Sequence, residues 1–140
     1  MPIQRYTHGP EVGFFQHSVY EKFGFCDIVR AGDHLHCGGI VPLRGEVTDI
    51  EVVGPGDFRA QYTFVLDTLA ALFERSGARF PQDIVDVKVM STNMALVNEN
   101  SDIFTKAFAG VRPALTYIGV SELFHPEQLI EIGATAYIGA

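Results

Sequence analysis

The sequence has little cysteine, few basic residues and no long apolar run. Its only two cysteines are Cys26 and Cys37, and no signal-like segment precedes Arg5, so we expect free thiols in a reducing cytoplasm. No apolar stretch approaches the roughly 20 residues that cross a bilayer, which argues against a membrane protein. No repeat or low-complexity stretch divides the chain, so a single domain over residues 1–140 is predicted.

Positive charge is scarce and dispersed. There are 10 Lys and Arg against 17 Asp and Glu, for a net charge of −7. No basic cluster is present that would follow a phosphate backbone, so nucleic-acid binding is disfavoured. Apolar residues make up 47% of the chain. In a small protein such an excess belongs either to the core alone or to the core and a subunit interface.

Residue spacing predicts an α+β fold with the element order β-β-α-β-α-β-β. Residues 1–22 are rich in aromatics without a clean period, so an irregular segment that lies over the core is expected there. The loop 43–56 contains several helix and strand breakers. The expected elements are a hairpin (26–30 and 34–38), a helix from Phe58 to about Gly77 with Asp57 as N-cap, a strand (84–90), a helix (97–108) and two strands (114–120 and 129–138).

Two helices suffice to cover one face of such a mixed sheet and leave the other bare. Because strand side chains alternate, Ala114, Thr116 and Ile118 are predicted to face the core. In strand 84–90, Val85, Val87 and Val89 are likewise predicted to point inward. Leu115, Tyr117, Leu129, Glu131 and Tyr137 are then predicted on the bare face, and such large side chains indicate sheet-to-sheet packing of subunits.

Several short motifs have a plain structural interpretation beside a chemical one. His34 and His36 share a strand face, but zinc needs three or four ligands and no second cluster matches. Cys37 is either a nucleophile or a small core residue, and no base is evident around it. The stretch Gly54 to Asp57 precedes a helix, but it lacks the lysine of a phosphate loop. We therefore predict no metal and no cofactor.

Two charged residues are more informative. Glu131 lies between Ile130 and Ile132 in an apolar strand. It is either a solvated edge carboxylate or a partly desolvated one that positions water. Arg112, beside Pro113, is either a solvated turn residue or a cation that points into a pocket near Leu115.

Five stretches, in order, resemble the Rid family, also called the YjgF/YER057c/UK114 family. They are "VRAGDHLHCGGIVP", "VGPGDFRAQYTFVLDTLAALFERSGA", "DIVDVKVMSTNM", "RPALTYIGV" and "LIEIGATAYI", and the family-like core covers residues 23–138. The resemblance implies a chorismate-mutase-like homotrimer whose sheets form an inner barrel, with active sites in clefts between subunits. It also implies a small-metabolite substrate and hydrolysis of reactive enamines and imines to a carbonyl compound and ammonia.

The family's site residues match only in part. Its carboxylate-binding arginine, in a P-A-R-S/T pattern, corresponds to Leu115 in "PALT", and its pocket tyrosine corresponds to Phe25 in "FGFCD". Its water-positioning glutamate is retained as Glu131 in "IEIGA", where Gly133 replaces a second carboxylate. Leucine cannot hold a carboxylate as a guanidinium does, and the loss should cost a few kcal/mol of binding, roughly.

Three functional hypotheses follow. The first is a divergent trimer that binds an apolar or aromatic metabolite among Phe25, Arg112, Leu115 and Tyr117 and hydrolyses a C–N bond with Glu131. The second is a non-catalytic ligand-binding or regulatory protein on the same scaffold. The third is ribonuclease activity, which is suggested by the label attached to some members of the family. The acidic net charge argues against it.

Overall fold

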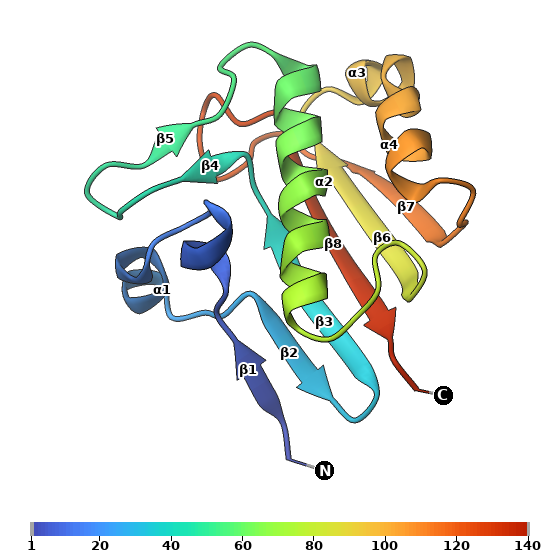
Figure 1. Cartoon of the computed structure of the whole chain (residues 1–140). Helices are drawn as coiled ribbons and strands as arrows, with labels where there is room; N and C mark the ends of the chain where they lie inside the picture. Colours follow the sequence, from blue (N-terminus) through green and yellow to red (C-terminus); the bar gives the residue numbers. More distant parts are fainter. Residues whose placement is uncertain (1, 140) are drawn as a thin grey trace.

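A six-stranded mixed sheet with helices against one face forms the structure, a computed structural model that describes residues 2–139 (Figure 1). All neighbouring strands pair antiparallel except β6 and β7, which run parallel. The predicted α+β class, with helices on one face of a mixed sheet, is confirmed. In spatial order the strands are β1 (Gln4–Tyr6), β2 (Ile28–Ala31), β3 (His34–Ile40), β8 (Ile130–Tyr137), β6 (Ile84–Ser91) and β7 (Ala114–Gly119).

Helix α2 (Phe58–Arg75) lies across the middle of the sheet, over β3 and β8 (Figure 1). Its N-cap is the predicted Asp57, whose carboxylate accepts a hydrogen bond from the backbone N–H of Ala60 at 3.0 Å. The helix ends two residues before Gly77, which has a φ of 101°. The predicted apolar stripe is confirmed, because all of its members are buried: Phe58, Tyr62, Val65, Leu69, Leu72 and Phe73.

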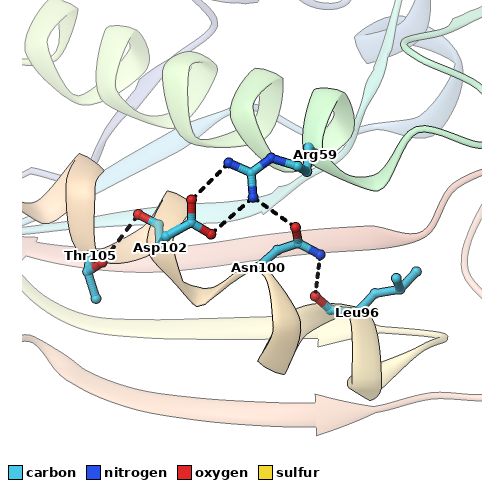
Figure 2. Close-up of polar contacts among 5 residues, drawn as sticks. All are labelled: Arg59, Leu96, Asn100, Asp102 and Thr105. Carbon is cyan, nitrogen blue, oxygen red and sulfur yellow. Dashed lines mark hydrogen bonds and ion pairs between the residues drawn. The ribbon is translucent and has the colours of Figure 1, made fainter.

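The second predicted helix is divided into α3 (Met94–Glu99) and α4 (Ser101–Phe108). At the joint the Asn100 side chain donates to the Leu96 carbonyl at 2.8 Å, so a side chain competes there for a helical acceptor. The Asn100 side-chain oxygen accepts a hydrogen bond from Arg59 of α2 at 2.9 Å. Arg59 also donates two hydrogen bonds to the Asp102 carboxylate, at 2.8 and 3.0 Å. Figure 2 shows this group, which ties the start of α2 to the joint between α3 and α4.

The prediction of an irregular segment over residues 1–22 is wrong. The N-terminal segment contains β1, a 3-10 helix η1 (Gly9–Val12) and most of helix α1 (His17–Phe23). It also supplies part of the core, since Phe14, Phe15, Val19 and Tyr20 are buried. The apolar residues lack a period because they come from a turn and a short helix, neither of which is long enough to show one.

The loop 43–56 contains a small hairpin, in which β4 (Leu43–Arg44) pairs antiparallel with β5 (Glu51–Val52). The predicted hairpin of β2 and β3 is confirmed, although β3 runs two residues further than predicted. Cys26 and Cys37 are both free thiols, as predicted. Among residues 2–139 no helix has the length and apolar character needed to cross a membrane.

The predicted faces of β7 are wrong. Leu115 pairs with Val87 and Tyr117 with Val89, and both valines are fully buried beneath the helices. Paired residues of neighbouring strands point to the same face, so Leu115 and Tyr117 lie on the helix side. All six residues of β7 are nonetheless exposed in the single chain, because the strand is at the sheet edge.

Val85 also departs from the prediction. It is 45% exposed, whereas Val87 and Val89 are buried as predicted. The pairing of β6 with β8 shifts between Ile84 and Asp86, so one extra residue of β6 is accommodated as a bulge. The alternation changes phase there, Ile84 turns inward, and Val85 turns outward.

Candidate functional site

Glu131 lies on the sheet face opposite the helices, where its two neighbours Ile130 and Ile132 point into the core. Its carboxylate is half-buried against Gly39 of β3, and its Oε1 accepts a hydrogen bond from the Gln128 amide at 3.4 Å. Burial raises the pKa of Glu131 above its ordinary value, and the Gln128 bond only partly offsets this. Glu131 is therefore the partly desolvated carboxylate of the two alternatives, not a freely solvated one.

An apolar cavity of about 230 Å³ adjoins this carboxylate. Gly39 is common to both, because it lines the cavity and lies under Glu131. Phe25, predicted as a pocket residue, lines the same cavity, whereas Glu131 is not among the described lining residues and approaches the cavity through Gly39. The other lining residues are Phe15, Val19, Phe23, Val41, Ile50 and Phe124. Sequence analysis missed Phe124, which is 57% exposed in the β7–β8 loop with no periodic pattern around it.

Two edge-to-face ring pairs contribute to the cavity wall. Phe15 and Phe25 have ring centroids 6.5 Å apart at 85°, and Phe23 and Phe124 have centroids 5.5 Å apart at 88°. Such offset contacts stabilise aromatic pairs by about 0.5–1.5 kcal/mol each. The first pair joins the residue before α1 to the segment before β2, and the second joins the end of α1 to the β7–β8 loop, which is far away in the sequence.

A second cavity, of about 370 Å³, lies between α4 and β7. Arg112, Leu115 and Tyr117 all line it, together with the stacked rings of Phe104 and Phe108. Three of the predicted site residues are thus together, but on the helix side of the sheet. Within one chain they are separated from Glu131, which projects from the other face.

A buried polar network holds the N-terminal segment behind Phe25. Asp27, 3% exposed, accepts from the Tyr20 hydroxyl at 2.6 Å and from the Gly9 backbone N–H at 2.9 Å. Burial raises the pKa of Asp27, and the hydrogen bond from Tyr20 opposes that rise. The Tyr20 ring lies 4.7 Å from that of Phe25. The network could not be foreseen, because its members come from three separate segments with no common motif.

The remaining candidates keep their structural roles. Cys37 is 8% exposed in the core, and burial raises the pKa of its thiol, which disfavours the reactive thiolate. His34 and His36 stand exposed and stacked on the open sheet face, with His34 beside Tyr137. Within residues 2–139 no three His, Cys, Asp or Glu side chains come together as metal ligands.

The family model described as Endoribonuclease L-PSP matches residues 16–138. Among solved structures, the fold is similar to a YjgF/YER057c/UK114 family member from Mycobacterium tuberculosis, with a TM-score of 0.79 at 22% identity over 98% of this chain and 100% of that chain. It is also similar to a Rid family protein of unknown function from Yersinia pestis, with a TM-score of 0.71 at 23% identity over 81% of this chain and 87% of that one.

Yeast Mmf1 matches with a TM-score of 0.81 at 17% identity, over 99% of this chain and 100% of that chain. At these identities the structural matches establish the fold, and the family model establishes the membership. The chain therefore belongs to the Endoribonuclease L-PSP family, which is the YjgF/YER057c/UK114 or Rid family that its sequence resembles.

Proposed function

We propose that three copies of this chain pack through their open sheet faces and hydrolyse an imine or enamine C–N bond in the cleft between neighbours. In support, the open face carries exposed apolar and aromatic side chains, including Ile118 at 36% and Tyr137 at 42% exposure. Among residues 2–139 the long helix α2 packs over β3 and β8 on the opposite face (Figure 1). An uncovered apolar sheet face is typical of a subunit interface.

The cleft combines side chains from two copies. One copy supplies Glu131, Phe25 and the apolar cavity beside Gly39. The neighbour supplies the edge of its β7, with Arg112, Leu115 and Tyr117. This division accounts for the placement of the two sets on opposite faces of the same sheet, since residues that cannot meet within one chain can meet across an interface. In this arrangement Arg112 is the basic residue closest to the position that Leu115 occupies in place of the family's arginine.

The chemistry requires one group that takes and returns a proton. The oxygen of water bonds to the iminium carbon while the C=N π electrons move to nitrogen, and the Glu131 carboxylate takes the water proton. Glu131 then returns that proton to the nitrogen of the carbinolamine. The C–N bond then breaks with its electron pair on the leaving ammonia, while Glu131 takes the hydroxyl proton and the carbonyl forms. Glu131 passes this proton to the ammonia, which departs as ammonium. A carboxyl with a pKa above its usual range suits both transfers near neutral pH.

The observation that carries this proposal is the half-buried Glu131 carboxylate, which packs against Gly39, a residue of the apolar cavity wall. The test is ammonia release from imines generated in situ by amino-acid and amine oxidases. We expect Glu131→Gln to lower the rate by about 10²–10⁴-fold, the range for general acid–base catalysis. Glu122→Gln, which alters an exposed carboxylate of the β7–β8 loop, is the matched control and should leave the rate unchanged. Full activity of the Glu131 variant would refute the assignment.

A non-catalytic role on the same scaffold is the second candidate. It is favoured by the replacement of the arginine and the tyrosine by Leu115 and Phe25, neither of which holds a charged substrate. Under this alternative, ligands bind in the cavity and no imine of either origin releases ammonia above the uncatalysed rate.

A further inference from the structure

We infer that the cavity beside Glu131 selects organic cations, namely ammonium and iminium compounds that carry an apolar or aromatic group and no carboxylate. This inference rests on the proposed function, because it names the substrate class of the same cavity. It does not follow from the retained glutamate alone. It depends on three features that act together: the rings, the carboxylate and the absence of basic residues from the cavity wall.

The rings provide the first feature. Four of the eight lining residues are phenylalanines, Phe15, Phe23, Phe25 and Phe124, arranged as two edge-to-face pairs. The face of an aromatic ring carries partial negative charge, and it attracts a cation within about 6 Å of its centroid. The structure contains one such contact already, because the Lys22 ammonium lies 5.4 Å from the centroid of Phe23.

The carboxylate provides the second feature. Glu131 is half-buried, and its one hydrogen bond comes from a neutral amide, that of Gln128. Within residues 2–139 it has no cationic partner. A desolvated carboxylate without a counter-charge gains a charge-assisted hydrogen bond when an ammonium or iminium group approaches it. A second carboxylate at the same place would instead be repelled in a medium of low polarity.

The third feature is the composition of the wall. Among the described residues that line the cavity there is no lysine, arginine or histidine. Two basic residues lie outside this wall. Lys22 is exposed at the end of α1, and Arg112 lines the other cavity of the same chain, so in the proposed trimer it reaches the cleft only from the neighbour. Leu115 is uncharged where the family's arginine would stand, so no cation offsets Glu131 from that position, and the net charge of −7 acts in the same direction.

The experiment compares three ligands of similar size that differ in charge: phenethylammonium, 2-phenylethanol and 3-phenylpropanoate. Their affinities for the full chain are measured by calorimetry at about pH 8, where the first is cationic and the last anionic. We expect phenethylammonium to bind about tenfold tighter than the alcohol, and the carboxylate to bind weakest. Glu131→Gln should reduce the ratio of cation to alcohol affinity to about one, and Glu122→Gln should leave that ratio unchanged.

Three results would overturn the inference. One is that 3-phenylpropanoate binds tightest. Loss of that binding in Lys22→Gln or Arg112→Gln would then identify the basic residue that holds the carboxylate. Another is a cation preference that persists in the Glu131 variant. The last is no measurable binding of any of the three ligands. Cation selectivity without ammonia release would refute the proposed hydrolysis and leave this inference standing. Rapid turnover of carboxylate-bearing imines, together with carboxylate-selective binding, would refute this inference and leave the hydrolysis standing.

Discussion

The Glu131 carboxylate occupies the space that a side chain on Gly39 would need. A Cβ built on Gly39 would lie 2.0 Å from Glu131 Oε2 and 2.7 Å from the carboxylate carbon. Gly39 lies in the irregular part of β3, where its pairing with β8 shifts between Cys37 and Ile40. The neighbouring Gly38 is in the same bulge, yet a Cβ there would meet nothing within 4 Å. The position of the catalytic candidate thus depends on one glycine and not on the other.

Gly39→Ala should therefore impair function far more than it impairs folding. The new methyl group meets the end of a flexible side chain, so Glu131 can turn away at a cost of about 1 kcal/mol or less. The displaced carboxylate no longer reaches the cavity, and ammonia release and the preference for cations should both fall at least tenfold, roughly. The measurements are the initial rate of ammonia release and the thermal unfolding of this variant and of its control.

Gly38→Ala is the matched control, with the same chemical change one residue away in open space. Equal loss of rate in both variants would mean that the bulge itself, and not the carboxylate position, governs the activity.

Glu131→Gln should stabilise the chain at neutral pH. Burial raises the pKa of Glu131 in the folded state, so ionisation of this group opposes folding. The penalty is absent below the ordinary carboxyl pKa, appears as the pH rises through the folded-state value, and is complete above it. Removal of the charge should raise the melting temperature at pH 7 and leave it unchanged at about pH 4, where the native carboxyl is also neutral. Thermal unfolding from about pH 4 to 8 checks the sign, and a constant difference between the two proteins would contradict it.

The long periodic segments could be predicted from the sequence, whereas the facing of the edge strand β7 could not. The α2 stripe was predicted correctly because six residues follow the helical spacing over four turns, with Asp57 as N-cap. In β7 both sets of alternating side chains are apolar, so alternation alone left the choice of face undetermined. Only the pairing of Leu115 with Val87 decides it. Val85 was misplaced because a bulge shifts the alternation without leaving a mark in the composition.

The grouping of the predicted site residues could not be read from the sequence. Phe25 lines one cavity, and Glu131 packs against Gly39 at its edge. Leu115, Tyr117 and Arg112 line another, because β7 presents them on the helix side. Phe124 was not identified as a cavity residue, since its contribution depends on how the long β7–β8 loop folds back on α1. Such non-local contacts have no fixed sequence spacing.

Tyr20→Phe should destabilise the chain and loosen the wall behind Phe25. The change removes the hydroxyl that donates to Asp27 at 2.6 Å. Asp27 is 3% exposed, and its carboxylate would keep only the hydrogen bond from the Gly9 backbone N–H. The expected loss is about 1–3 kcal/mol of unfolding free energy by denaturant titration. Tyr6→Phe is the control, because the Tyr6 hydroxyl bonds only to the nearby Gln4 in an exposed setting. A loss in Tyr20→Phe no larger than in Tyr6→Phe would mean that the network contributes nothing.

Ile118→Glu should break the proposed assembly without unfolding the chain. Ile118 pairs with Met90, which pairs in turn with Glu131, so all three lie on the open sheet face. In a single chain Ile118 is 36% exposed and a glutamate there stays solvated, whereas between packed sheets the charge would be buried at a cost of several kcal/mol, roughly. Light scattering should show three chains for the native protein and one for the variant, with similar circular dichroism. Ile3→Glu, at a residue 54% exposed just before β1, should remain trimeric. A native protein of one chain would refute the shared cleft, and the separation of Glu131 from Leu115 would then leave each cavity to act alone.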